Sequence, residues 1–368
     1  MEGTKEPEDA FDILENSIDT EELHVAWNRK GQFTSIYDKN EQREILKPGS
    51  CANVLVTYED RPHNYDAWDI NSYYTEKPWV LEDEAEIEVI ERGPVRAVLR
   101  ISGTYLDSRI QQDVIVYSKG TKIDIVNRVD WCEKNLLLRN YIPVNIHADQ
   151  ASYEIQYGNV QRPTHYNTSW DQAKFEVCAH KWIDISENGY GVSILNDCKY
   201  GCDIHNGVIG LTMLKSACYP NPAADKEKHE FSYSIFPHRD GWREGNTIQK
   251  AYELNNPMIA RYKGKDNKKD SRDLPPEEYS FVSVNKDNIM IEVIKKAEDS
   301  DALILRMYEA FNRRTQAMVR FDQNVQEAWE CSMLEEDERR LKIEKHFIYV
   351  DFNPYEIKTV KVVLQRLI

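Results

Sequence analysis

Hydrophobic and polar residues alternate through most of this chain, with the period of two that is typical of half-buried β-strands. In the first such stretch, Leu23, Val25 and Trp27 share one face, residues 29–31 supply a turn, and the alternation returns over residues 33–37. This pattern predicts a β-hairpin. Similar runs follow at residues 87–89, 95–101, 123–131, 142–146, 192–194, 209–213 and 231–235.

The spacing of these runs predicts an all-β chain. Gly, Asn, Asp or Pro separates them at short intervals, whereas parallel strands would need long amphipathic helices between them. Residues 263–278, KGKDNKKDSRDLPPEE, are almost wholly polar and include a Pro-Pro pair, so they are predicted to form a linker or a long exposed loop. Beyond them, a second set of strands is predicted at residues 282–284, 291–293, 303–307 and 360–364.

Residues 321–341 fit two interpretations. Val325, Trp329 and Met333 lie four apart, as they would on one face of a helix, but they also share one face of a strand. The neighbouring strands favour the β assignment.

The densest group of polar and aromatic side chains lies in residues 154–186, EIQYGNVQRPTHYNTSWDQAKFEVCAHKWIDIS. Pro163 has no N–H and restricts the residue before it, so residues 162–167 are predicted to form an irregular loop rather than a strand. Loops of this kind often carry binding residues, although a surface loop held by its own hydrogen bonds fits the composition equally well. The candidates for contact with a ligand are Arg162, His165, Asn167, Trp170 and Asp171.

A second candidate is the turn DRPHNYDAWDI at residues 60–70, which brings Asp66, Trp68 and Asp69 close together. A carboxylate beside an indole is suited to a sugar, because the ring face stacks on C–H groups while the carboxylate oxygens accept hydroxyl protons. The alternative is a capped turn in which Trp68 is buried as an anchor of the sandwich core.

Metal-binding and nucleophilic motifs receive little support. His147 and Asp149 form a His-x-Asp pair, but a catalytic zinc needs about three protein ligands and an open position. Cys198 and Cys202 lie four apart without a second pair at zinc-finger spacing. The sequence has no GxGxxG, no phosphate loop and no GxSxG elbow, so no metal, cofactor or catalytic nucleophile is predicted in this chain.

The segment PHRDGW at residues 237–242 places His238, Arg239 and Asp240 at the end of a predicted strand. These residues fit either a polar cluster that faces a cleft or a surface turn with an exposed ion pair. The surface turn is the favoured interpretation.

The composition limits the classes of binding partner and the cellular compartment that are compatible with this chain. The net charge of −16 argues against nucleic acid or an anionic membrane, and it leaves a neutral sugar open. No apolar run approaches the roughly 18 residues of a membrane span, and the first residues lack the apolar segment of a signal peptide. The seven cysteines are scattered and odd in number, which favours free thiols in a reducing cytoplasm.

Six sequence motifs follow one another along the chain, each occurring once. They are DRPHNYDAWDI at residues 60–70, ERGPVRAVLR at 91–100, RPTHYNTSWDQAKFEVCAHKWIDISENGYGVSILNDCKYG at 162–201, FSYSIFPH at 231–238, LRMYEA at 305–310 and FNPYEIKT at 352–359. Together they resemble the C-terminal β-region of the α-mannosidases of glycoside hydrolase family 38. The resemblance runs from about residue 13 to the end of the chain.

The resemblance implies a definite domain order. A connecting segment at residues 1–12 precedes a large mutarotase-like antiparallel β-supersandwich at residues 13–262. The polar segment at residues 263–278 then leads to a small C-terminal β-sandwich at residues 279–368.

The resemblance also implies retaining, zinc-dependent hydrolysis of terminal α-mannosides. In that family the zinc ligands and the aspartate nucleophile belong to an N-terminal barrel, which a helical bundle follows, and neither has a counterpart here. The chain is therefore expected to be inactive alone, to pack on the barrel and bundle of the same enzyme, and to lend its two polar stretches to the rim around the mannoside. A homo-oligomer is left open.

Two other classes of function stay open. The chain fits a stand-alone carbohydrate-binding or scaffold module, because mutarotase-like sandwiches occur in several carbohydrate enzymes. It also fits a sugar epimerase that uses one of its own histidines with a carboxylate as acid and base. Anomer exchange of α-mannose or galactose, followed by NMR, would separate the epimerase from a binding module.

Overall fold

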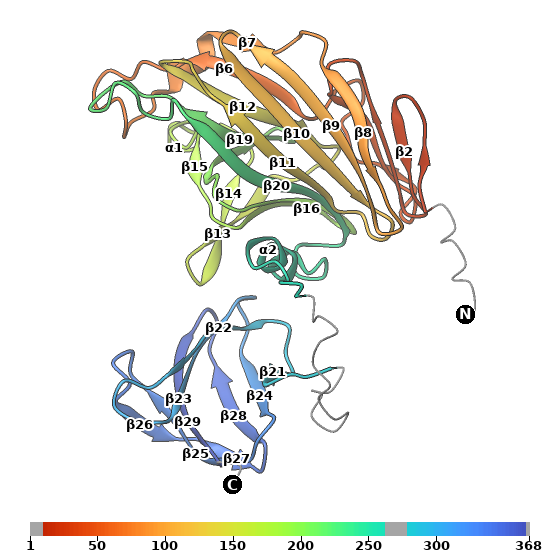
Figure 1. The fold of residues 1–368 in the computed structure, drawn as a ribbon. Helices are drawn as coiled ribbons and strands as arrows, with labels where there is room; N and C mark the ends of the chain where they lie inside the picture. Colours follow the sequence, from red (N-terminus) through yellow and green to blue (C-terminus); the bar gives the residue numbers. More distant parts are fainter. Residues whose placement is uncertain (1–9, 262–277, 366–368) are drawn as a thin grey trace, which may run out of the picture. The chain divides into compact units, whose positions relative to one another are not determined.

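The computed structural model describes residues 10–261 and 278–365. These residues form two compact units: the first comprises residues 10–154 and 160–258, and the second comprises residues 155–159 and the described residues from 259 onward. Both units are built from antiparallel β-sheets, so the predicted all-β fold, a large supersandwich followed by a small sandwich, is confirmed (Figure 1). The predicted connecting segment at residues 1–12 and the predicted linker at residues 263–278 lie almost entirely outside the described residues.

Three sheets make up the first unit, although residues 155–159, which are counted with the second unit, include the ends of two of their strands. Their strands, in order across each sheet, are β1(Asp12–Ile13), β2(Ser17–Asp19), β3(Leu23–Trp27), β4(Phe33–Asp38) and β5(Arg43–Glu44) in a five-stranded sheet; β14(Gly158–Pro163), β13(Gln150–Ile155), β16(Trp182–Glu187), β17(Tyr190–Asn196), β20(Lys228–Arg239), β11(Ile123–Asp130), β10(Ser108–Tyr117), β9(Arg96–Tyr105) and β8(Glu86–Arg92) in a nine-stranded sheet; and β15(Val177–Cys178), β18(Gly201–His205), β19(Val208–Lys215), β12(Leu136–Pro143), β6(Val54–Glu59) and β7(Pro78–Val80) in a six-stranded sheet.

The core of the first unit is formed by the inward faces of these sheets. Every second residue of a strand points inward, as Ile123 and Ile125 do in β11 and Ile209 and Leu211 do in β19. The period of two in the sequence therefore reflects burial on one face. Burial of these apolar side chains supplies the main favourable contribution to folding.

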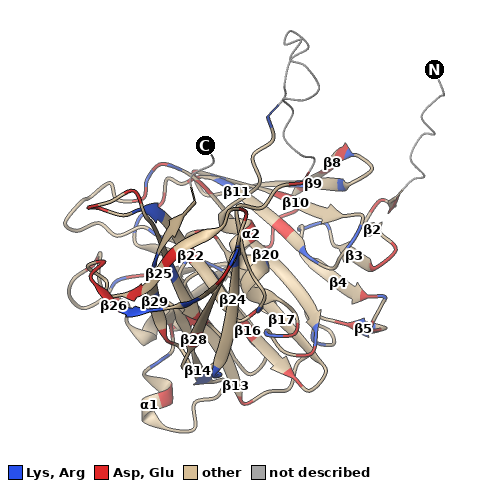
Figure 2. Cartoon of the chain, turned by 90° about the horizontal axis from the view of Figure 1, so that it is seen from below, with Lys and Arg blue, Asp and Glu red and all other residues tan. Residues whose placement is uncertain are grey.

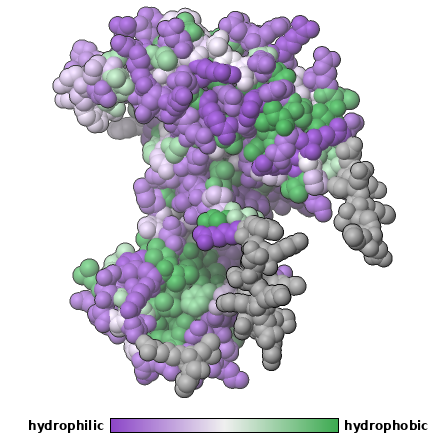
Figure 3. All heavy atoms as spheres, viewed as in Figure 1, coloured by the Kyte–Doolittle hydropathy of each residue, from purple (hydrophilic) through white to green (hydrophobic). Residues whose placement is uncertain are grey.

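The outer strand β8 ends the nine-stranded sheet, and its exposed apolar residues lie among charges. Val89 and Ile90 are exposed, while Glu88 and Glu91 are close to them in the strand, and Figures 2 and 3 show this mixture of charged and apolar positions near the sheet edge. Charged side chains on an open edge hinder pairing with another chain.

The opposite edge of this sheet corrects one prediction. Residues 162–167 were expected to be irregular throughout, yet Arg162 and Pro163 are the last residues of β14. Because β14 is an edge strand, the N–H that Pro163 lacks need not break a ladder hydrogen bond.

The second unit contains two sheets around its own core, which includes Leu305, Met307, Val319, Val350 and Val360. Residues 321–341 contain two strands, so the β assignment of this stretch is confirmed. In order, the strands are β21(Val282–Val284), β24(Thr315–Phe321), β28(Phe347–Phe352) and β27(Lys342–Glu344) in one sheet, and β22(Ile289–Lys296), β23(Leu303–Glu309), β29(Ile357–Leu364), β25(Val325–Cys331) and β26(Asp337–Arg340) in the other.

The described residues contain three short helical segments, η1(Ser72–Glu76), α1(Ser169–Gln172) and α2(Thr247–Asn255), of which α2 packs against β17. None of the helices in the described part of the chain combines the length and the apolar character that a membrane crossing requires.

Candidate functional site

The face of the six-stranded sheet that points away from the main core carries a second cluster of side chains. Tyr58, Tyr74 and Leu137 are buried there, and Tyr141 and Phe175 pack against them. Neighbouring strands bring them together, since Leu137 of β12 pairs with Tyr58 of β6. Two of these residues lie close to the predicted polar stretches, because η1 follows the turn at residues 60–70 and Phe175 follows α1.

Arg139 of β12 is the centre of this face, with only 2% of its surface exposed. Its guanidinium donates hydrogen bonds to the carboxylate of Asp203 and to the hydroxyls of Tyr74 and Tyr141. The rings of Tyr74 and Tyr141 have centroids 5.9 and 5.3 Å from its Cζ atom, within range of a cation–π contact. We call these four residues the Arg139 cluster.

The electrostatics of the cluster keep Arg139 charged and the tyrosines neutral. Burial by itself would lower the pKa of Arg139, but the carboxylates of Asp203 and Glu176 more than offset this effect and hold the pKa well above its usual value. Burial raises the pKa of Tyr74 and of Tyr141, although the nearby guanidinium opposes the rise. Both hydroxyls are therefore neutral hydrogen-bond partners at physiological pH.

A glycine makes the ion pair at the centre of the cluster possible. Gly210 of β19 pairs with Tyr141 on one side and with Asp203 on the other, so the guanidinium of Arg139 passes over it. A Cβ atom at position 210 would lie 2.5 Å from Asp203 Oδ1 and 2.7 Å from Arg139 Nη2. Only a residue without a side chain leaves room for this pair.

The loop after β14 lies against the same sheet. The ring of Phe175 lies 6.3 Å from that of Tyr74, and the ring of Tyr166 stacks on His205 of β18 at 3.8 Å. Thr212 of β19 donates a hydrogen bond to Glu176. These contacts fix the loop that carries the predicted residues 165–171.

Within this loop the predicted residues divide by their contacts. Arg162 lies over the ring of Tyr153, with its Cζ 5.7 Å from the centroid. Asp171 forms a capping box with Thr168 at the start of α1, and its Oδ2 is 3.9 Å from His165 Nδ1, which is too long for a hydrogen bond. These contacts hold the loop in shape.

The other two predicted residues of the loop point to solvent. Trp170 is 80% exposed, and Asn167 is exposed as well. The backbone N–H of Asn167 donates to His165 Nδ1 at 3.4 Å. The loop therefore presents an indole, an amide and part of an imidazole on its outer side.

The turn at residues 60–70 is tied down by its first candidate residue. Asp66 Oδ2 accepts hydrogen bonds from the backbone N–H groups of Cys218 at 2.5 Å and Tyr219 at 3.0 Å, in the segment after β19. Trp68 is 70% exposed, so the alternative in which it anchors the core is wrong. Asp69 is exposed beside it.

Several buried polar atoms on this side of the molecule have no partner among the described residues. They are Asp66 Oδ1, Arg139 Nε, Arg162 Nε and Glu176 Oε2. Buried polar atoms are normally hydrogen-bonded, so an ordered water is the expected partner of each of these atoms.

His165 also lines a polar hollow of about 490 Å³ together with His147 and Asp149. On its wall Arg43 donates to Glu187 at 2.6 Å, and the second oxygen of Glu187 accepts from the backbone N–H of His147 at 2.7 Å. Across the described ranges, no group of three or more His, Cys, Asp or Glu side chains is placed to hold a metal ion, so these residues do not fit a zinc site.

Two family models match the chain. The first, described as the glycosyl hydrolases family 38 C-terminal domain, covers residues 18–223, and the second, the family 38 C-terminal beta sandwich domain, covers residues 288–360. The chain belongs to the C-terminal region of glycosyl hydrolase family 38. The resemblance carried by the six sequence motifs is thus confirmed.

Known relatives agree with this assignment. The chain is 35% identical to alpha-mannosidase G of Dictyostelium discoideum over 364 residues, and 34% identical to alpha-mannosidase 2C1 of Homo sapiens over 363 residues. These matches cover 95% and 96% of this chain but only 32% and 34% of the relatives, so the chain spans about a third of their length. An alpha-mannosidase from Enterococcus faecalis V583 shares the fold, with a TM-score of 0.74 and 17% identity over 94% of this chain and 42% of that one.

The sequence pattern of this family 38 chain did not indicate one buried pair, His238 and Asp184. The exposed ion pair predicted in PHRDGW is present, since Arg239 and Asp240 lie 3.7 Å apart, but His238 is buried. Its Nε2 lies 2.8 Å from Asp184 Oδ2 and 3.1 Å from the hydroxyl of Ser193. The side chains of His238 and Asp184 are only 3% and 2% exposed, so a sugar has no access to this histidine–carboxylate pair and an epimerase reaction there is disfavoured.

The Arg139 cluster was also missed. The signal was present in LLLRNYIP at residues 136–143, where a single arginine interrupts an apolar strand. A charge in such a position is almost never fully buried without a partner. The sequence could not identify that partner, because Asp203 lies 64 residues away.

Proposed function

We propose that this chain is the non-barrel, C-terminal part of a retaining, zinc-dependent α-mannosidase that hydrolyses terminal α-mannosides. The observation that carries the proposal is the match of 95–96% of the chain to a third of proteins named as alpha-mannosidases. Zinc and the attacking carboxylate are assigned to the barrel outside these 368 residues, and no described residue is given a role in bond cleavage.

In this proposal the chain packs on the barrel through the side of the first unit that carries the Arg139 cluster. The two largely exposed indoles on this side, those of Trp68 and Trp170, support this choice. Trp68 and Trp170, together with Asp69, His165 and Asn167, form the rim that faces the mannoside. Asp66, Arg162 and Asp171 position that rim through the contacts described above.

The compartment proposed is the cytoplasm. All seven cysteines are free thiols in the structure, as a reducing environment would keep them.

The isolated 368-residue chain is expected to release no p-nitrophenol from p-nitrophenyl α-mannoside and to retain no stoichiometric zinc after dialysis. The same chain joined to its barrel-bearing polypeptide should show both activity and bound zinc. The measurements are an absorbance assay and metal analysis of the two proteins at equal concentration. Cleavage by the isolated chain would contradict the proposal.

Trp170→Ala and Trp68→Ala, made in the complete enzyme, are expected to raise KM at least severalfold, since an exposed indole that stacks on a sugar contributes about 1 kcal/mol or more to binding. Both side chains are largely exposed, so the stability of the fold should change little. Leu334→Ala, at a residue of the second unit that is 82% exposed, is the matched control. Michaelis constants equal to those of the parent for both tryptophan variants would remove these residues from the rim.

A further inference from the structure

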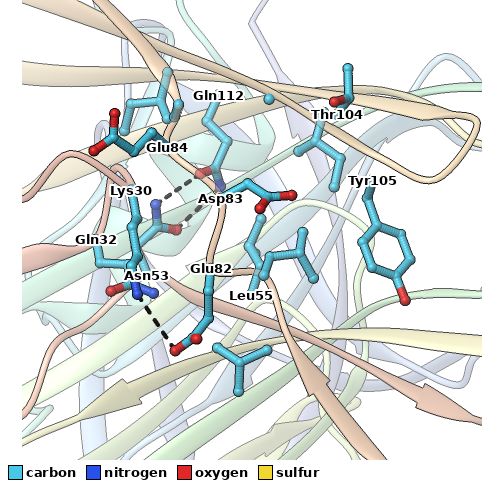
Figure 4. Close-up of a pocket in the computed structure, with 16 residues that line it drawn as sticks. Lys30, Gln32, Asn53, Leu55, Glu82, Asp83, Glu84, Thr104, Tyr105 and Gln112 are labelled. Atoms are coloured by element: carbon cyan, nitrogen blue, oxygen red, sulfur yellow. Dashed lines mark hydrogen bonds and ion pairs between the residues drawn. The ribbon is translucent and has the colours of Figure 1, made fainter.

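We propose that the first unit binds one neutral monosaccharide ring in a cavity between β9, β10 and the connection from β7 to β8. The cavity has a volume of about 250 Å³, and Figure 4 shows the side chains that line it. This inference concerns binding by the first unit itself and does not depend on the proposed hydrolysis of mannosides.

The cavity exists because a glycine interrupts a row of inward-facing side chains. On β9, Ile101, Gly103 and Tyr105 face the same side, and Gly103 pairs with Ile110 of β10. A Cβ atom added at Gly103 would meet no atom within 4 Å. Protein interiors are normally close-packed, and a glycine inside a strand often marks the place where a ligand approaches the backbone.

The floor of the cavity is a pair of buried amides. Asn53 Nδ2 donates to Gln112 Oε1 at 2.8 Å, and Gln112 Nε2 donates to Asn53 Oδ1 at 3.2 Å. Gln112 Nε2 also donates to Asn127, and Asn53 Oδ1 accepts from Tyr233. These further hydrogen bonds fix the orientation of both amides. Among the described residues, Gln112 Oε1 receives this one hydrogen bond and keeps a second lone pair for a ligand hydroxyl.

A third amide adds a donor. Gln32 lines the cavity and is only 9% exposed. Its Oε1 accepts a hydrogen bond from Asn28 Nδ2 at 3.0 Å. The NH₂ group of Gln32 is therefore the part of this side chain that can bind a ligand. A hydroxyl oxygen of a ligand can accept from it.

The mouth of the cavity carries one carboxylate that is not paired. The connecting segment is fixed at both ends, because Leu81 N donates to Leu55 O and Ala85 N donates to Arg29 O, both at 2.9 Å. Its neighbouring acids pair with cations, Glu82 with Lys30 and Glu84 with Arg29, each at 3.5 Å.

Asp83 lies between these two ion pairs and has no ion pair of its own within the described residues. In Figure 4 its carboxylate lies between the amide pair and Tyr105. It is therefore an acceptor placed for a hydroxyl group.

These features select the class of ligand. One donor, two acceptors and an apolar wall that includes Leu55, Ile101 and Ile110 suit a ring with hydroxyls on its edge and C–H groups on its faces. The excess of acidic side chains at the mouth disfavours anions. The volume lies just below the roughly 300–1,000 Å³ of typical ligand pockets, so one ring fits rather than an oligosaccharide.

The test is titration of the 368-residue chain with D-mannose, D-glucose and D-galactose, followed by saturation-transfer NMR and calorimetry. At least one hexose is expected to bind with a millimolar dissociation constant. Gly103→Leu fills the cavity without removing a hydrogen bond and should weaken binding at least tenfold. Asp83→Asn should weaken it severalfold, because a charged acceptor is replaced by a neutral one.

Two control variants separate occupancy from unfolding. Gly103→Ala leaves most of the space and should bind nearly as the parent does, and Ser102→Val alters the neighbouring position, whose side chain points to the opposite face of β9. Thermal unfolding of each variant confirms that it is folded. The inference would be overturned if none of the three hexoses binds, or if Gly103→Leu binds a hexose as tightly as the parent does.

Discussion

Asp203→Ala is expected to lower the free energy of unfolding of the first unit by about 3–5 kcal/mol. The substitution removes the carboxylate that pairs with Arg139 and leaves a buried guanidinium whose remaining hydrogen-bond partners are two neutral hydroxyls, with the carboxylate of Glu176 as a further electrostatic neighbour. Loss of one member of a buried ion pair costs far more than the pair contributes, because the remaining charge keeps its desolvation penalty. Urea unfolding of parent and variant, followed by circular dichroism, measures the difference.

A double variant separates this explanation from a simple loss of packing. Arg139→Met combined with Asp203→Leu removes both charges, keeps similar volumes and should recover most of the lost stability. Asp69→Ala, an exposed carboxylate on the neighbouring turn, is the control and should change the free energy of unfolding by less than about 0.5 kcal/mol. A loss below about 1 kcal/mol for Asp203→Ala would show that the Arg139 cluster does not organise this face.

The strands of this chain were largely readable from its sequence, because each buries one face. Ile123 and Ile125 in β11 and the two strands within residues 321–341 are examples. The pairing of strands was not readable, since partners such as β11 and β20 lie about a hundred residues apart and alternation carries no information on register. For the same reason, the sequence did not show that residues 155–159 belong to the second unit. The ring of Tyr157 packs there on the ring of Tyr308, with the two centroids 5.4 Å apart.

The sequence indicated the place of the candidate site more accurately than the roles of the individual residues in it. The two polar stretches do lie on one side of the first unit, joined through Tyr74 and Phe175. Three acidic residues in them were expected to face a sugar, yet Asp66 binds backbone N–H groups and Asp171 caps α1, so Asp69 is the only exposed one of the three. Backbone donors in loops require acceptors, and the spacing of Thr168 and Asp171 is a capping-box signature that could have been recognised.

In the second unit, Glu309→Ala is expected to cost at least about 3 kcal/mol of stability, because it removes the acceptor of two buried and two partly buried hydrogen bonds. Glu309 is completely buried, and its Oε1 accepts from Asn288 Nδ2 at 2.7 Å and from Phe311 N at 2.8 Å. Its Oε2 accepts from Arg313 N at 3.1 Å and Tyr355 N at 3.0 Å. One carboxylate thus joins the motifs LRMYEA and FNPYEIKT, which lie far apart in the sequence.

Hydrogen exchange in the complete chain tests this role at the atoms concerned. The amides of Phe311, Arg313 and Tyr355 should exchange much faster in Glu309→Ala, while those of β11 in the first unit keep the parent rates, because only the second unit loses its acceptor. Glu309→Gln retains the volume but turns one acceptor into a donor, so it should lie between parent and alanine variant. Glu327→Ala, at an exposed residue of β25, is the matched control. Protection at these three amides equal to that of the parent would mean that backbone geometry alone, without the carboxylate, holds these two loops together.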